Sequence, residues 1–444
     1  MIRVGVLTDD VLLEIFDFYV RYGEEGWQSL IHVCRRWRSL VLESPRRLNL
    51  QLLCTPKTPT RDKLGVWPTL PIIVAGSLGI LSYTGNIIAA LEQSHRVCRV
   101  SLGHLARWQS QKVLAAMQVP FPELTYLRLS SNDETTPVIP DSFLGGISPR
   151  LQFFELVGIP FPGLPKHLLS ATQLVQLRLS RIPDSGYISP EAMVTLLSAL
   201  SSLERLSLAF KSPRSRPDGV SRSPPPSERS ILPALEYFQF NGVIDYLEDF
   251  VTNIDSPQLD TLQITISNQI DFDCPRLAQF VNCTPKLGKH DEAHVKFGDR
   301  SVRFLFGTLE IFIPSTEPDR RLSSLARVCS SALPSTVEDL YIERQYSSIV
   351  WKNDATENNL WLQLLLPFTA VKNLYLSKEF GPGIAPALQE LVGSRKIEVL
   401  PSLQDIFVED LPPSGPLQEN IGQFVAARQL TISVWDKDSN TKLM

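Results

Sequence analysis

The chain has 444 residues, of which 43% are hydrophobic and 20% are charged, and its formal net charge is -4. This composition is typical of a globular protein long enough for two or three compact domains or one repeat array. It lacks the basic excess that would favour nucleic acid or an anionic membrane surface, so we expect neither among its partners.

The cysteines and the apolar runs indicate an intracellular compartment. The six cysteines lie far apart and form no Cys-x-x-Cys pair, and the N-terminal region is acidic where a secretory leader would be basic. The longest apolar run, residues 72–81, is interrupted by glycines and is too short to span a bilayer. We therefore expect reduced thiols and a cytoplasmic or nuclear location.

Residues 7–45 contain two amphipathic segments. Their apolar residues recur at helical spacing, as Val11, Leu12, Ile15, Phe16 and Tyr19 and then as Leu30, Val33, Trp37 and Leu40. Asp9 or Asp10 is expected to cap the first helix, and Ser44-Pro45 to end the second. Fewer than about 40 residues cannot bury this apolar surface alone, so a partner or the following domain should share it.

The same segment resembles an F-box, the three-helix module by which substrate receptors bind a Skp-type adaptor. The F-box pattern of Leu-Pro-acidic, then Leu, Ile and Phe, then Val-Cys-basic-x-Trp is matched by Leu7-Thr8-Asp9, Leu12, Ile15, Phe16 and Val33-Cys34-Arg35-Arg36-Trp37. Thr8 stands where the pattern has proline. The resemblance implies a module over residues 1–50 whose adaptor-binding residues are Leu7, Leu12, Ile15, Phe16, Val33, Cys34, Trp37 and Leu40. An ordinary buried helical hairpin is the alternative explanation.

Residues 51–95 are expected to connect this module to a repeat array. From Leu124 onward, an apolar residue is followed by others three and five positions later, at intervals of about 23 to 34 residues. The clearest copies begin at Leu124, Leu151, Leu174, Leu203, Leu235, Leu259, Val337, Val371 and Leu403. Such a recurrence is typical of leucine-rich repeats.

Each copy predicts a short strand whose alternate apolar residues point inward, and helices are expected between strands, as at 190–200, 246–254 and 275–281. The predicted fold is α/β: an irregular solenoid over residues 96–434 with a parallel sheet on its concave side and helices and loops on its convex side, followed by a tail, 435–444. Residues 211–230, rich in Ser, Pro and Arg, predict a disordered insertion. Residues 266–304 carry little of the pattern and should hold distorted or inserted repeats.

The residues between the inward leucines are candidates for binding a protein target on the concave face. They are Tyr126, Arg128, Arg178, Arg205, Tyr237, Asp339, Tyr341, Glu343, Tyr375, Asp405 and Glu409. Basic groups lead and acidic groups follow, which would suit a polar ligand with its own charge asymmetry. A solvated sheet face without a ligand is the alternative.

The sequence contains no constellation that indicates catalysis, a metal or a cofactor. His290 and His294 lie four residues apart, but Asp291 follows the first histidine where a zincin needs Glu. Taken whole, the chain is similar to fungal F-box proteins with leucine-rich repeats. That resemblance implies a non-catalytic receptor joined through a Skp-type adaptor to a cullin scaffold. A plain repeat scaffold, with the N-terminal helices as its cap, is the alternative from another class.

Overall fold

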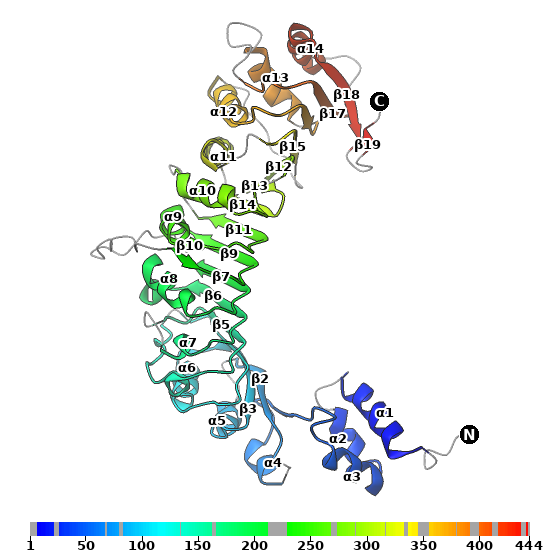
Figure 1. Ribbon diagram of the computed structural model, residues 1–444, viewed down its shortest axis with the longest axis vertical. Helices are drawn as coiled ribbons and strands as arrows, with labels where there is room; N and C mark the ends of the chain where they lie inside the picture. Colours follow the sequence, from blue (N-terminus) through cyan, green and yellow to red (C-terminus); the bar gives the residue numbers. More distant parts are fainter. Residues whose placement is uncertain are drawn as a thin grey trace. The chain divides into compact units, whose positions relative to one another are not determined.

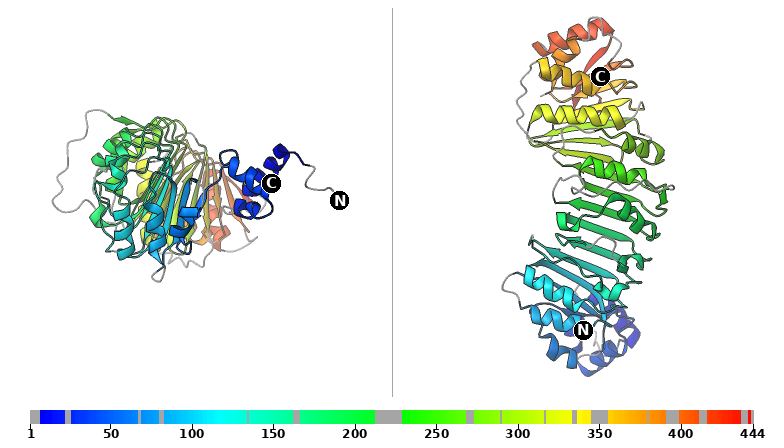
Figure 2. Two further views of the ribbon diagram at one scale, coloured as in Figure 1. Left: turned by 90° about the horizontal axis from the view of Figure 1, so that it is seen from below. Right: turned by 90° about the vertical axis from the view of Figure 1, so that its left-hand side faces the viewer.

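The computed structural model describes residues 7–21, 26–66, 69–79, 83–133, 135–161, 166–211, 229–267, 273–288, 290–315, 317–332, 336–344, 355–378, 380–390, 399–410, 416–436 and 441–442. The chain forms two compact units, unit 1 with residues Met1–Ile188 and Ala199–Leu203, and unit 2 with Ser189–Ser198 and Glu204–Met444. Each unit is α/β, with mostly parallel strands, and apart from the first three helices of the chain the helices lie along one face of the strands (Figures 1 and 2). We call the other face of the strands the helix-free face.

Unit 1 begins with three short helices, α1 (Asp9–Arg21), α2 (Gly26–Ile31) and α3 (Arg35–Glu43), which we call the helix module. The helices bury Phe16, Trp27 and Val41 among them. The Trp27 Nε1 donates a hydrogen bond of 2.9 Å to the carbonyl oxygen of Gln51, which joins the module to the segment before the first strand. The module therefore has a small apolar core of its own.

The start of α1 differs from the prediction. Thr8 precedes the helix, and its Oγ1 lies 3.5 Å from the backbone nitrogen of Val11. Asp9 and Asp10 lie inside the first turn, where the helix dipole also favours acidic groups. The prediction that one of the two aspartates caps α1 is therefore wrong. The predicted end of α3 at Ser44-Pro45 is confirmed.

The described part of unit 1 continues as parallel strands paired in chain order. They are β1 (Leu52–Cys54), β2 (Ile72–Ser77), β3 (Val97–Leu105), β4 (Tyr126–Ser131), β5 (Phe153–Val157) and β6 (Gln176–Ile182). The intervening helices are α4 (Thr60–Val66), α5 (Thr84–Leu91), α6 (Arg107–Ala116), η2 (Phe143–Gly146), α7 (Lys166–Leu169) and η3 (Asp184–Gly186). Residues 51–95 are thus no simple connector, because the apolar segments of β1 and β2 extend the sheet toward the N-terminus.

Unit 2 carries two parallel sets of strands joined by an antiparallel meander. The strands are β7 (Arg205–Phe210), β9 (Tyr237–Gly242), β11 (Thr261–Ile266), β12 (Glu292–Gly298), β13 (Ser301–Phe306), β14 (Leu309–Pro314), β15 (Asp339–Arg344), β16 (Asn373–Leu376), β17 (Asp405–Glu409) and β18 (Thr431–Asp436), with the short β8 (Ser230–Ile231), β10 (Ile254–Asp255) and β19 (Thr441–Lys442). The helices are α8 (Pro190–Ser198), α9 (Ile244–Thr252), α10 (Pro275–Cys283), α11 (Pro318–Ala332), α12 (Ala355–Leu365), α13 (Gly381–Glu390) and α14 (Pro416–Arg428).

The meander explains why residues 266–304 lose the repeat pattern. Strands β12, β13 and β14 pair antiparallel, while β14 pairs parallel with β11 and β12 pairs parallel with β15. Gly307-Thr308 makes the turn between β13 and β14, and the φ of Gly307 is 56°, which suits a two-residue hairpin. Hairpin turns replace the strand-to-helix unit here, so the spacing of apolar residues changes with them.

The predicted repeat strands are confirmed as parallel strands with buried apolar positions. Leu127 and Leu129 of β4 are both 0% exposed, and the corresponding residues of the later copies are buried in the same way. Burial of one such leucine contributes about 2 kcal/mol relative to an exposed one. Residues 212–228 of the predicted insertion lie outside the described residues, whereas Ser230 belongs to β8. Trp435, predicted to begin a tail, lies in β18 and is buried.

Candidate functional site

The first candidate site is an apolar stripe on the surface of α1. Leu12, Leu13 and Phe16 are buried in the helix module, whereas an adjacent side of the helix is apolar as well. That side consists of Val11 at 44% exposure, Ile15 at 47%, Phe18 at 65% and Tyr19 at 49%. Helix α1 therefore has two apolar faces, one inside the module and one at the surface, and a surface stripe of this kind is typical of an interaction site.

The eight predicted adaptor-binding residues differ in their exposure. Ile15, Val33 and Cys34 are exposed, and Leu7, Trp37 and Leu40 are half-buried. Leu12 and Phe16 are at most 1% exposed, and the centroid of the Phe16 ring lies 4.8 Å from that of Trp37. Leu12 and Phe16 were predicted to contact a partner, but the structure buries both in the core that holds the three helices together.

Surface ion pairs fix the helices of the module against one another. Arg36 on α3 lies 2.7 Å from Asp9 and also donates to the carbonyl oxygen of Leu7 at 2.6 Å. Arg47 pairs with Asp10 at 3.0 Å and with Glu14 at 2.9 Å. All these pairs are largely exposed, so they position the start of α1 more than they stabilise the fold.

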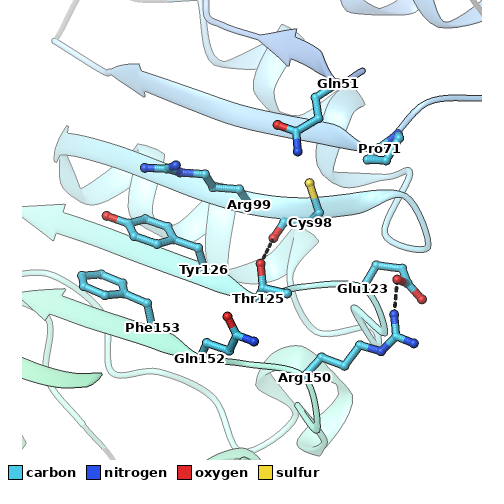
Figure 3. A pocket seen from close by; sticks show the side chains of 10 residues that line it. All are labelled: Gln51, Pro71, Cys98, Arg99, Glu123, Thr125, Tyr126, Arg150, Gln152 and Phe153. Atoms are coloured by element: carbon cyan, nitrogen blue, oxygen red, sulfur yellow. Dashed lines mark hydrogen bonds and ion pairs between the residues drawn. The ribbon is translucent and has the colours of Figure 1, made fainter. Parts of the chain in front are cut away.

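The second candidate site is on the helix-free face of unit 1. Arg99, Tyr126 and Phe153 are adjacent in register on β3, β4 and β5, and Figure 3 shows their side chains side by side. The rings of Tyr126 and Phe153 stack with centroids 4.2 Å apart and planes 4° from parallel. The guanidinium of Arg99 lies 4.2 Å from the Tyr126 centroid, and that of Arg178 lies 6.0 Å from the Phe153 centroid. We call these four residues the Arg–aromatic row.

A charged pair lies beside the row. Arg128 on β4 and Glu155 on β5 are adjacent in register, and the Arg128 Nε lies 3.2 Å from the Glu155 Oε2. The Glu155 side chain is 11% exposed while that of Arg128 is 49% exposed. The carboxylate is therefore largely shielded, and the guanidinium remains accessible.

A pocket of about 480 Å³ opens where these strands begin (Figure 3). Its lining residues are Gln51, Pro71, Cys98, Arg99, Glu123, Thr125, Tyr126, Arg150, Gln152 and Phe153. Arg150 pairs with Glu123 on one side of the pocket, and Thr125 donates a hydrogen bond of 3.1 Å to the carbonyl oxygen of Cys98. Three residues of the row, Arg99, Tyr126 and Phe153, supply the wall opposite this ion pair.

The first predicted target-binding residues are accessible. Tyr126, Arg128, Arg178, Arg205 and Tyr237 are exposed or half-buried. In unit 2 the guanidinium of Arg205 lies 5.8 Å from the Tyr237 centroid, and the Tyr237 hydroxyl donates to Gln263 at 2.7 Å. These side chains are supported by neighbours, yet they remain within reach of a ligand.

The later predicted residues separate into two groups. Asp339, Asp405 and Glu409 are half-buried. Tyr341, Glu343 and Tyr375 are instead 8%, 7% and 2% exposed, so these three predicted target-binding residues are buried and not accessible at the surface.

Tyr341 and Tyr375 are buried because they belong to an aromatic stack that crosses the sheet. Tyr341, Tyr375 and Phe407 are adjacent in register, and their ring centroids follow at 4.1 and 4.6 Å. Trp435 packs across the two tyrosines, 5.8 Å from Tyr341 and 5.5 Å from Tyr375, and the ring of His294 lies 4.4 Å from Tyr341, at the end of the stack opposite Phe407. Burial and the neighbouring Tyr375 raise the pKa of Tyr341, so its hydroxyl stays neutral. We call these five residues the aromatic ladder.

Glu343 is also held by neighbours and is not presented to solvent. Its Oε2 lies 3.3 Å from the His294 Nδ1 and 3.2 Å from the Lys296 Nζ. His294 and Lys296 are both on β12, which is parallel to β15, the strand of Glu343. The meander therefore supplies the groups that satisfy this carboxylate.

Several of the residues that matter here were absent from the predicted sites. Arg99 precedes the first recognised repeat, yet Val97, Val100 and Leu102 around it have the same offsets of three and five with valines in the first two positions. Phe153 lies between two inward residues of a recognised copy. The spacing thus contained both, whereas nothing local predicts that His294 and Trp435 reach the same stack.

Among the described residues, no group of three or more His, Cys, Asp and Glu side chains is arranged to hold a metal ion. Within the same residues, none of the helices combines the length and apolarity needed to cross a bilayer. No family model matches the chain, and no curated protein matches it.

Proposed function

We propose that the chain is a non-catalytic receptor subunit of a Skp–cullin–F-box type ubiquitin ligase, acting in the cytoplasm or nucleus. In this proposal the helix module is an F-box that docks on a Skp-type adaptor, and a leucine-rich-repeat-like sheet binds a protein target. A receptor of this kind accelerates transfer by proximity alone, because it raises the effective concentration of a target lysine near the transferring enzyme.

One observation carries the proposal: α1 leaves a second apolar stripe at the surface although the module already has a core. Val11, Ile15 and Tyr19 recur at a spacing of four residues, so they form one continuous strip along the helix. If α1 to α3 only capped the repeats, this strip should pack against them. Its exposure favours docking of a partner helix over the scaffold alternative.

The test is binding of the full-length chain to a purified Skp-type adaptor. Val11→Glu combined with Ile15→Glu places two carboxylates in the stripe while keeping good helix formers in α1, so the fold should persist. We expect adaptor affinity to fall by about 30-fold or more, since each buried charge costs on the order of 1 kcal/mol or more.

The matched control is Ile147→Glu, an apolar side chain in unit 1 that is 57% exposed and lies outside the helix module. It should bind the adaptor as the wild type does, and circular dichroism should show equal helix content in all three proteins. Failure of the wild-type chain to bind the adaptor would support the scaffold alternative. Unchanged affinity of the double variant would place the contact elsewhere.

A further inference from the structure

The Arg–aromatic row presents an unusual chemistry to a ligand. One face of the Tyr126 ring is covered by Phe153 and the other by the guanidinium of Arg99. Phe153 is likewise bounded by Tyr126 and by Arg178. Because the ring faces are occupied, a ligand meets the ring edges, and an aromatic edge carries partial positive charge. Edges and guanidiniums together favour an anion.

The charges on the helix-free face of unit 1 also favour an anion. The outward positions of β3 to β6 carry three guanidiniums, those of Arg99, Arg128 and Arg178, and one carboxylate, that of Glu155. The carboxylate is nearly buried and is paired with Arg128. The positive groups therefore outnumber the negative ones and are the more exposed.

The dimensions suit an extended peptide. The row crosses from β3 to β6, roughly 15 Å at about 4.8 Å between neighbouring strands. About five extended residues cover that distance. The adjoining pocket of about 480 Å³ has room for a side chain of the same segment, with Thr125 and Gln152 as hydrogen-bonding groups.

We propose that the helix-free face of unit 1 binds an acidic, extended segment of a partner protein, with at least two Asp or Glu side chains within about five residues. Arg99 and Arg178 hold the carboxylates at the two ends of the row. The pocket takes a neighbouring side chain. Calling this segment the ligase target rests on the proposed function, whereas its recognition by the Arg–aromatic row does not.

A protein segment fits these residues better than a nucleic acid does. Nucleic-acid sites neutralise many phosphates with an extended basic surface. Here three guanidiniums are spread over four strands of a chain whose net charge is -4. A nucleic acid as the true ligand is an outcome that the experiment distinguishes.

The experiment is selection from a random library of displayed peptides, about ten residues long, on the immobilised full-length chain. The selected pool should be enriched in Asp and Glu relative to the starting library. One selected peptide is then synthesised with a fluorescein label, and its affinity is measured by anisotropy. Raising NaCl from about 50 to about 500 mM should weaken binding, because the contacts are charged and accessible.

The variant that tests the site is Arg99→Gln combined with Arg178→Gln. We expect affinity for the selected peptide to fall about tenfold or more, because two charge-assisted contacts are removed. The control, Arg61→Gln, changes an exposed arginine on α4 and should leave affinity unchanged. Since all three side chains are exposed, the melting temperatures should stay close to that of the wild type.

Three results would overturn the inference: selection of neutral or basic peptides, equal affinity of the double variant and the wild type, or tighter binding of a labelled single-stranded oligonucleotide than of any selected peptide. Adaptor binding is measured on the same proteins. If the wild-type chain binds the adaptor but does not select acidic peptides, this inference fails while the proposed ligase role stands. A wild-type chain that selects acidic peptides but does not bind the adaptor removes the ligase role alone.

Discussion

The Arg–aromatic row of unit 1 and the aromatic ladder of unit 2 are built from the same kind of sheet position. In both, rings on neighbouring parallel strands stack in register on the helix-free face. In unit 1 the stack ends in guanidiniums and its rings stay half-buried. In unit 2 it continues through Phe407, and Trp435 packs across the two tyrosines, so they are buried. The neighbours of a ring decide whether a repeat position becomes an accessible surface or a core.

The largest difference should appear when one ring is removed from the middle of each stack. Tyr375→Ala deletes a fully buried side chain and leaves a cavity beside Trp435, so we expect a loss of about 3 to 5 kcal/mol in the free energy of unfolding. Phe153→Ala should cost about 1 to 2 kcal/mol, because that ring is half-buried and its removal opens no enclosed cavity. Urea unfolding followed by circular dichroism measures both.

The matched control for this pair is Tyr83→Ala, whose ring is 72% exposed. Its effect should lie within about 0.5 kcal/mol of zero. Equal costs for Tyr375→Ala and Phe153→Ala would contradict the distinction between a closed ladder and an open row.

A second comparison concerns two histidines that pack against aromatic rings, His294 in unit 2 and His167 in unit 1. His294 lies at the end of the ladder, half-exposed, whereas His167 on α7 is 1% exposed among Phe143 and Phe154, at centroid distances of 5.3 and 5.6 Å. Burial lowers the pKa of His167 from 6.5 to about 4. The folded state therefore binds this proton less readily than the unfolded chain does.

Acid should destabilise the folded protein through His167. Stability from neutral His167 is fully present above about pH 6.5 and is lost as the pH falls toward 4, by about 3 kcal/mol in total. His167→Leu should remove this part of the pH dependence, while at pH values near 8 the two proteins should differ only by packing. The measurement is urea unfolding of both proteins between about pH 4 and 8. Parallel stability curves for variant and wild type would contradict a buried neutral histidine.

The strands of this chain could be predicted from its sequence, whereas the accessibility of individual side chains could be predicted only in part. The spacing of apolar residues predicted the parallel strands and the helices between them, since strand burial alternates with a fixed period. It also placed Tyr126 and Arg128 correctly at the surface. Accessibility of Tyr375, in contrast, depends on Phe407 and Trp435, which lie about 30 and 60 residues away and are adjacent only through register.

The helix module shows the same limit. The helical spacing predicted that α1 is amphipathic, and the resemblance to an F-box predicted three helices. The resemblance assigned Leu12 and Phe16 to a partner, but both are buried, as are Trp27 on α2 and Val41 on α3, and Phe16 packs against Trp37 on α3. A helix with apolar residues on two sides offers no sequence signal for which side is inside, because both sides satisfy the same period. Only the packing against α2 and α3 decides it.

The smallest expected effect compares the two nearly buried glutamates of the helix-free faces. Glu155 is paired with Arg128, and Glu343 with Lys296 at the same distance of 3.2 Å. Arg128→Gln should lower the free energy of unfolding by about 1 kcal/mol, because it leaves the shielded carboxylate of Glu155 without its cation. The loss stays this small because the guanidinium of Arg128 is half-exposed. Lys296→Gln should cost less, because the Nδ1 of His294 lies 3.3 Å from the same carboxylate and can still donate to it. Double-mutant cycles with Glu155→Gln and Glu343→Gln isolate the two coupling energies. A coupling for Lys296 equal to or larger than that for Arg128 would contradict this, because it would show that His294 does not share the charge of Glu343.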